Sequence, residues 1–142
     1  MLNNFKKKRI FITGSTGFKG TWLSYILASS GAKVMGYALP QMVNEKSHYN
    51  DLNLKNKMTQ IEGDIRNREE LISAVQKFEP DYVFHLAAQA LVRPSYNDPH
   101  NTFETNVMGS VNILDAVLAT KSVRALVYVT SDKCYENNEW VW

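Results

Sequence analysis

Short apolar runs alternate along the whole chain with longer stretches in which apolar residues recur every three or four positions. The short runs are rich in β-branched and aromatic residues and are followed by turn residues, which predicts strands at 9–13, 33–38, 58–62, 81–86 and 125–130. The longer stretches predict helices at 18–30, from 67 to about 79, and at 101–120. Apolar strands that alternate with helices are typical of a parallel sheet with both faces covered. The pattern therefore predicts one doubly wound α/β domain over residues 1–142, which ends after its fifth strand.

The first predicted helix has a marked apolar side. Trp22, Leu23, Ile26 and Leu27 share one face of it, and Gly31 stands where a glycine commonly ends a helix. We expect Trp22 to belong to the core.

The second and third predicted helices carry further local signals. Asn67 is followed three residues later by Glu70, a variant of the capping box. The third helix is predicted to be amphipathic from the spacing of its apolar residues, which are Phe103, Val107, Val111, Leu114 and Leu118. The polar segment 41–57 is expected to form a loop with one short helix, and segment 93–99, with two prolines, a loop.

Composition narrows the class of protein. The chain has 142 residues with 44% hydrophobic and 21% charged residues, which suits one globular domain with a core. Its 16 Lys and Arg against 14 Asp and Glu are too balanced for a nucleic-acid-binding surface, and the basic run 6–9 is expected to be solvated.

The single cysteine, Cys134, excludes an internal disulfide and favours the reducing cytoplasm. No run approaches the roughly 18 apolar residues of a membrane helix, and neither a signal peptide nor a metal site is predicted.

The segment between the first strand and the first helix carries candidate chemistry. Residues 14–20 fit the pattern G-x-x-G-x-x-G. Gly14 would allow a tight turn, Gly17 the approach of a pyrophosphate, and Gly20 close packing of the helix. Helix N-termini favour anions, so the sequence predicts dinucleotide binding in a Rossmann-like domain. The alternative is a structural turn; a Walker loop is disfavoured because Lys19 precedes Gly20.

The choice of cofactor depends on the following strands. The second strand ends with 35–38, which contains neither an acid for the ribose hydroxyls nor an arginine for a 2′-phosphate. The lack of a basic residue favours NAD over NADP. Asp64, after the third strand, could accept a hydrogen bond from the adenine amino group, or could be a turn residue after Gly63.

The ends of the fourth and fifth strands are further candidate positions, since ligands of open α/β sheets bind there. Residues 130–135 crowd hydroxyl, carboxylate and ammonium groups beyond an apolar strand, which is costly unless they face a polar ligand. A capping turn is the alternative for Ser131 and Asp132. Residues 85–89 are small enough to let a cofactor approach, although alanines equally suit close packing.

Two polar residues lie four apart on the third helix, toward its buried side. Asn106 and Ser110 could form a hydrogen-bonded pair between helix and sheet, or a relay through water or a lysine. Both interpretations remain open.

Together these motifs resemble the extended short-chain dehydrogenase/reductase superfamily, and within it the nucleotide-sugar 4,6-dehydratases. The segments that carry the resemblance are 13–20, 63–66, 85–89, 104–109 and 130–135. The glycine loop is shared by many relatives, whereas the block Ser131 to Tyr135 is specific. Within the family the chain is similar to the lyases that act on CDP-glucose, on the strength of Phe18-Lys19, Leu91-Val92-Arg93, Asn137 and Glu139-Trp140.

The resemblance implies a reaction and roles for residues. NAD would take a hydride from the glucosyl C4, water would leave from C5 and C6, and the hydride would return to give CDP-4-keto-6-deoxyglucose for deoxysugar and lipopolysaccharide O-antigen synthesis. Ser131 would bind the 4-oxygen, Asp132 would protonate the departing 6-hydroxyl, and Lys133, where dTDP-glucose relatives have Glu, would assist at C5. The expected cofactor residues are Gly14, Thr16, Gly17, Phe18, Lys19, Gly20, Asp64, Ile65, Leu86, Ala87, Ala88 and Thr105.

One family feature is missing. None of the tyrosines is followed by a lysine four residues later, whereas the superfamily takes the 4-hydroxyl proton with a Tyr-x-x-x-Lys pair. We therefore expect the chain to be the N-terminal NAD-binding part of such an enzyme, inactive by itself and homo-oligomeric when full-length. The alternatives are another epimerase or reductase of the superfamily, which would not need Asp132-Lys133, or a non-catalytic NAD-binding module.

Overall fold

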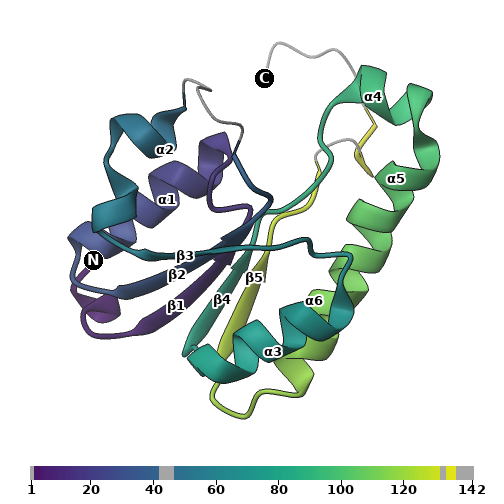
Figure 1. Cartoon of the computed structure of the whole chain (residues 1–142). Coiled ribbons are helices and arrows are strands. Elements are labelled where there is room, and N and C mark those ends of the chain that lie inside the picture. The colour runs from purple at the N-terminus through teal and green to yellow at the C-terminus, as the bar shows by residue number, and fades with distance from the viewer. Residues whose placement is uncertain (1, 42–46, 132–133, 137–142) are drawn as a thin grey trace.

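Five parallel strands form one sheet in the order β3-β2-β1-β4-β5 (Figure 1). The computed structural model describes residues 2–41, 47–131 and 134–136. The strands are β1 (Arg9–Thr13), β2 (Lys33–Ala38), β3 (Thr59–Glu62), β4 (Tyr82–His85) and β5 (Ala125–Tyr128). The order reverses between β1 and β4, so the connections wind in both directions and the predicted doubly wound α/β fold is confirmed.

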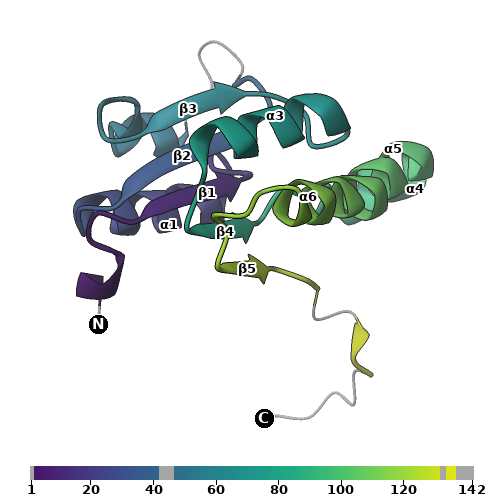
Figure 2. The ribbon, with the colours of Figure 1, turned by 90° about the horizontal axis from the view of Figure 1, so that it is seen from below.

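Helices lie on both faces of the sheet (Figure 2). One face carries α1 (Phe18–Ser29), with the short α2 (His48–Asp51) and a 3₁₀ turn (Leu54–Asn56) beside it. The other face carries α3 (Arg68–Phe78) and α6 (Gly109–Leu118), which pack on each other. The chain reaches α6 through α4 (Val92–Asn97), α5 (Pro99–Phe103) and a π-helical turn (Glu104–Met108). A further 3₁₀ turn, Leu2–Phe5, precedes β1.

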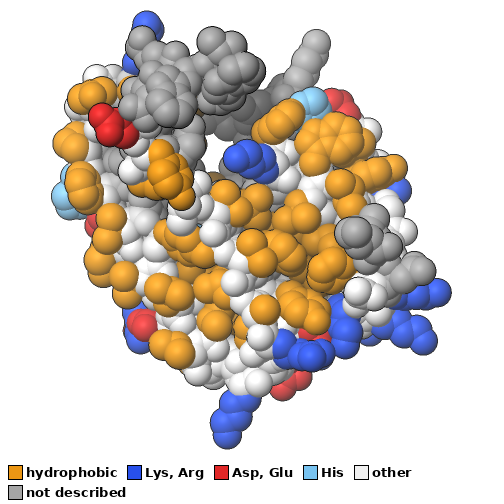
Figure 3. All heavy atoms as spheres, turned by 180° about the vertical axis from the view of Figure 1, so that it is seen from behind, with side chains coloured by type: hydrophobic (Ala, Val, Ile, Leu, Met, Phe, Trp, Pro, Cys, Tyr) orange, Lys and Arg blue, Asp and Glu red, His pale blue; other side chains and the backbone are white. Residues whose placement is uncertain are grey.

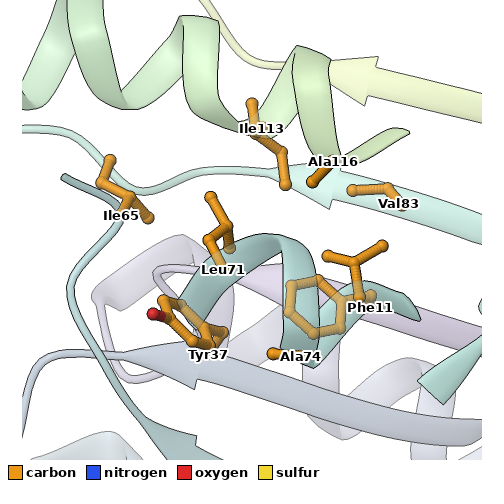
Figure 4. Close-up of a cluster of buried hydrophobic side chains, with 9 residues drawn as sticks. Phe11, Tyr37, Ile65, Leu71, Ala74, Val83, Ile113 and Ala116 are labelled. Atoms are coloured by element: carbon orange, nitrogen blue, oxygen red, sulfur yellow. The ribbon is translucent and has the colours of Figure 1, made fainter. Parts of the chain in front are cut away.

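The alternation of side chains along β1 divides the core in two. Phe11 joins the cluster under α3 and α6, with Tyr37, Leu71 and Ile113 (Figure 4). Its neighbours Ile10 and Ile12 point to the opposite face, where they pack with Val34 and Leu27 under α1. All three β1 residues are fully buried, as a central strand of a two-sided sheet should be.

Two predicted helix signals are confirmed. The side chain of Asn67 accepts a hydrogen bond from the backbone N–H of Glu70 and so caps α3, whereas the N–H of Asn67 donates to the carbonyl of Asp64, so the reciprocal half of the capping box is not formed. Gly31 follows α1 with a φ of +86°, a conformation that favours glycine, and its N–H donates to the carbonyl of Ala28.

The prediction of a loop at 93–99 is wrong, because this segment is mostly helical. Pro94 lies in the first turn of α4, where a backbone N–H would have no helical partner. Pro99 begins α5, and Asp98 before it accepts from the N–H of Asn101 as the cap. Prolines therefore mark two helix starts here.

The burial expected for Trp22 is also wrong. Trp22 is 41% exposed, and α1 turns small residues, Gly20, Thr21 and Ser24, toward the sheet. A helix that packs closely on a sheet needs small residues at the contact, so its largest side chain lies outside. The apolar stripe expected on the third predicted helix is exposed too. Its residues lie on α5, the π-helical turn and α6, and α6 buries Ile113 in their place; the stripe consists of Phe103, Val107, Val111, Leu114 and Leu118.

The sheet face that carries α1 is apolar beyond the helix. Val127 of β5 is paired with Phe84 of β4 on this face, and Val127 and Val129 are 47% and 41% exposed. Figure 3 shows hydrophobic side chains across the middle of this side of the molecule. Within the described residues no helix covers β5 here, and none is long and apolar enough to cross a membrane.

Candidate functional site

The glycine loop turns tightly between β1 and α1. Gly14 has a φ of +68°, and a Cβ on it would lie 2.8 Å from the backbone nitrogen of Ala87. A Cβ on Gly20 would overlap the carbonyl oxygen of Gly14. Both positions therefore require glycine, for the turn and for the close packing of α1 that the sequence predicts.

A cleft of about 430 Å³ opens at the carboxyl ends of four strands. Gly14 contributes from the end of β1, Leu39 from β2, Asp64 from β3 and Ala87 from β4. The expected cofactor residues that the structure brings together in this cleft are Gly14, Thr16, Gly17, Asp64, Ile65, Leu86, Ala87, Ala88 and Thr105. This is the place where an open α/β sheet binds its ligand.

Other expected residues lie elsewhere. Phe18 is 68% exposed and lines a neighbouring cavity with His48, its ring centroid 5.5 Å from that imidazole. Lys19 lies exposed in the first turn of α1, and Gly20 is buried behind the loop. Ser131 is exposed beyond β5. Asp132 and Lys133 lie outside the described residues.

The backbone along one wall of the cleft is fixed by Thr13. The N–H groups of Leu86 and Ala87 both donate to its Oγ1, at 3.2 and 3.3 Å. Thr13 also lies beside His85 in the sheet register, with 2.7 Å between Oγ1 and the imidazole Nδ1. Since Oγ1 accepts two hydrogen bonds, its own hydrogen is directed to Nδ1, which must then be unprotonated.

His85 is accordingly a buried neutral histidine. Only 2% of it is exposed, and burial lowers its pKa to about 4. Its other neighbour in the register is Tyr128, whose ring centroid lies 5.1 Å away. The sequence identified His85 only as part of a strand-end motif, because its partner Thr13 is 72 residues away.

Asn106 and Ser110 are joined by a hydrogen bond from the Ser110 hydroxyl to the backbone carbonyl of Asn106, and each also binds a further element. Asn106 makes a reciprocal pair with the backbone of Gln89: its Nδ2 donates to the carbonyl at 2.9 Å and its Oδ1 accepts from the N–H at 2.8 Å. Ser110 is hydrogen-bonded to the hydroxyl of Tyr128 on β5. These contacts are those of a hydrogen-bonded pair between helix and sheet, in which Asn106 holds the loop after β4; the relay stays a prediction.

The β3 side of the cleft carries a charged pair that the sequence only half identified. Asp64 accepts from Arg66 at both carboxylate oxygens: Oδ1 from the backbone N–H and Oδ2 from Nε, each at 2.9 Å. These hydrogen bonds hold the pKa of Asp64 below its usual range, so it is ionised and only accepts. Arg66 also donates from Nη1 to Asn101 of α5 at 2.7 Å. Arg66 and Asn101 line the cleft too. Arg66 belongs to the motif segment 63–66 but was given no role from the sequence, and Asn101 lies in none of the motif segments.

Comparison with known proteins gives consistent relatives. The model of the GDP-mannose 4,6 dehydratase family matches residues 11–139. The chain is 48% identical over 99% of its length to CDP-glucose 4,6-dehydratase of Salmonella typhimurium, and covers 39% of that protein. It is 30% identical over 92% of its length to CDP-paratose 2-epimerase of Salmonella typhi, again covering 39%. The chain thus spans about two fifths of these curated relatives.

Solved structures share the fold. The epimerase Mth375 of Methanothermobacter thermautotrophicus superposes with a TM-score of 0.79 at 27% identity, over 92% of this chain and 37% of that one. The Bordetella bronchiseptica enzyme WbmH, in complex with NAD⁺, superposes with a TM-score of 0.74 at 27% identity, over 89% and 40%.

Proposed function

The chain belongs to the GDP-mannose 4,6-dehydratase family, and we propose that it is the N-terminal, NAD-binding part of a CDP-glucose 4,6-dehydratase. The observation that carries this proposal is the cleft at the four strand ends, with the glycine loop at the N-terminus of α1 forming one side. The 48% identity to a CDP-glucose 4,6-dehydratase supports the choice among nucleotide sugars.

The residues of the cleft fit an NAD molecule. Gly17 lies in the cleft and its missing Cβ leaves the helix N-terminus open to a pyrophosphate, whose charge the backbone N–H groups favour. On the β4 side of the cleft, the small side chains of Ala87 and Ala88 leave room for the cofactor. Asp64 offers an acceptor to the adenine amino group. NAD, when bound, supplies a hydride acceptor.

The end of β2 supports NAD rather than NADP. Leu39 lies there in place of a basic residue that would bind a 2′-phosphate. Lys55 lines a second cavity that adjoins Leu39, but Glu62 lines the same cavity and would repel a phosphate.

Catalysis is assigned to the block after β5. Ser131 would hydrogen-bond the 4-oxygen of the sugar, Asp132 would give its proton to the departing 6-hydroxyl, and Lys133 would assist removal of the C5 proton. The position of these residues in the sequence, after β5, supports the assignment. β5 pairs with β4, and the residues that follow β4 line the cleft. The proposal includes a cytoplasmic homo-oligomer that serves deoxysugar and lipopolysaccharide synthesis.

A second candidate is an epimerase, since several of the similar proteins and solved structures are epimerases, the Salmonella typhi relative and Mth375 among them. An epimerase leaves the mass of its substrate unchanged, whereas a dehydratase removes one water. Only the dehydration needs the acid Asp132.

Incubation of the full-length protein with CDP-glucose and NAD, followed by mass spectrometry, tests the proposal. We expect a product that has lost one water, with no net consumption of NAD, and a slower loss of water in Asp132→Asn, with NAD binding retained. UDP-glucose and GDP-mannose, incubated in parallel, are expected to react much more slowly. An isomer of unchanged mass would instead identify an epimerase, and no reaction with any nucleotide sugar would favour a non-catalytic module.

A further inference from the structure

The β3 side of the cleft contains a connected series of side chains, Asp64, Arg66 and Asn101, which we call the rim relay. Arg66 occupies the centre: its backbone N–H and Nε bind the two oxygens of Asp64, and its Nη1 binds Oδ1 of Asn101. Its Nη1 also lies 3.6 Å from a carboxylate oxygen of Glu104. The relay thus joins the loop after β3 to α5 and the π-helical turn.

The backbone under the relay is fixed as well. Asn112 of α6 is buried, and its Nδ2 donates to the carbonyls of Ile65 and Arg66 at 2.9 and 3.2 Å. Gly109 lets α6 approach closely, since a Cβ there would run into the side chain of Ile65. Arg66 is therefore held at its backbone by α6 and at its guanidinium by α5, which limits the positions its side chain can take.

The hydrogen bonds leave one acceptor direction of Asp64 open. A carboxylate accepts at about four lone-pair sites, two on each oxygen. Both sites of Oδ2 are taken by Nε and Nη2 of Arg66, while Oδ1 accepts the backbone N–H of Arg66 alone within the described part of the chain. Asp64 lines the cleft. The open site on Oδ1 therefore suits a ligand N–H.

This geometry discriminates between purines. Adenine carries an amino group at C6, which donates to a carboxylate. Hypoxanthine carries a carbonyl at C6 and its N–H at the neighbouring N1, so at the C6 position it would place two acceptors against each other. A carboxylate that could rotate would lose this preference, because it could turn toward solvent.

We propose that Arg66, anchored by Asn101, is a positioning residue that fixes the Asp64 carboxylate so that the cleft selects adenine over 6-oxopurines in its dinucleotide. This inference rests on the proposed NAD binding and adds the residue that makes the base selection specific. The expected preference is about tenfold, the contribution of one charge-assisted hydrogen bond.

A second arginine of the chain offers a matched control. Arg68 makes the same type of contact, with its Nε 2.8 Å from Oδ2 of Asp115. This pair joins α3 to α6, and neither residue lines the cleft. Its loss removes an Arg–Asp pair without changing the base-binding geometry.

Calorimetric titration of the purified protein with NAD and with nicotinamide hypoxanthine dinucleotide tests the inference. We expect the wild type to bind NAD about tenfold more tightly, and Arg66→Gln to bind NAD with that ratio reduced to about twofold. Arg66→Lys should also show a low ratio, because an ammonium keeps the charge but not the fork of donors. Asn101→Ala should lower the ratio less, and Arg68→Gln should leave it unchanged.

The contrary outcomes are separable. If Arg66→Gln weakens both dinucleotides equally and keeps the wild-type ratio, Arg66 acts through charge or folding alone and the inference is overturned. If Arg68→Gln lowers the ratio as much as Arg66→Gln, the effect is not local to the rim relay, which overturns it equally. If the wild type binds neither dinucleotide, the proposed NAD binding fails, and the inference fails with it.

Discussion

Replacing Gly17 with alanine is expected to weaken NAD binding about 100-fold and to change the free energy of unfolding by less than about 1 kcal/mol. The backbone of Gly17 has a φ of −71° and a ψ of 169°, which any residue adopts. Among the described residues, a Cβ there would meet only the carbonyl oxygen of Gly14, at 3.3 Å. The fold therefore tolerates a methyl group, but the pyrophosphate would be held away from the backbone N–H groups of the helix N-terminus.

Calorimetry with NAD and urea unfolding of the same variant measure the two effects. Gly31→Ala is the matched control, because Gly31 has a φ of +86° and lies at the opposite end of α1, away from the cleft. We expect this control to lose about 1 kcal/mol of stability and to bind NAD as the wild type does. Wild-type affinity in Gly17→Ala would show that no pyrophosphate approaches this position.

Lowering the pH from 7 to 4 is expected to remove about 3 kcal/mol of stability through His85. Its pKa is about 4 in the folded chain, below the usual 6.5 of histidine, because the imidazole is buried. The unfolded chain therefore binds the proton first, and the stabilisation is complete above pH 6.5 and declines as the pH falls toward 4. The hydrogen bond from Thr13 to Nδ1 acts in the same direction, since it requires the unprotonated nitrogen.

Urea unfolding of the wild type and of His85→Gln at pH 7 and pH 4 isolates this contribution from that of the carboxylates. The stability difference between the two proteins should shrink by about 3 kcal/mol at the lower pH. His100→Gln is the control, because that imidazole is largely exposed. An equal loss of stability in the wild type and His85→Gln would contradict the assignment.

The sequence predicted the strands well because each is a compact apolar run that ends at a turn signal. β1 and β2 agree with the prediction at both ends, and β3, β4 and β5 are one or two residues shorter. The glycine loop was predictable for a similar reason, since its pattern is local. Trp22 was misplaced because helical spacing shows which residues share a face but not how closely that face approaches the sheet.

Contacts between distant segments account for what the sequence missed in the candidate site. Arg66 binds Asn101 across 35 residues, and Thr13 binds His85 across 72. No periodicity connects such distant positions, and neither the type of each residue nor its local sequence indicates its partner. The α4 helix was missed for the opposite reason: its prolines are local signals, but proline marks a loop and the first turn of a helix equally well.

Binding of NAD to the cleft is the central claim, and calorimetric titration of the purified wild-type protein with NAD and NADP tests it most directly. We expect NAD to bind, and NADP to bind at least about tenfold more weakly, because Leu39 offers no partner to a 2′-phosphate and Glu62 repels it. Tighter binding of NADP would contradict the assignment of the β2 end and would indicate that Lys55 receives the phosphate. No heat of binding from either dinucleotide would contradict the claim itself.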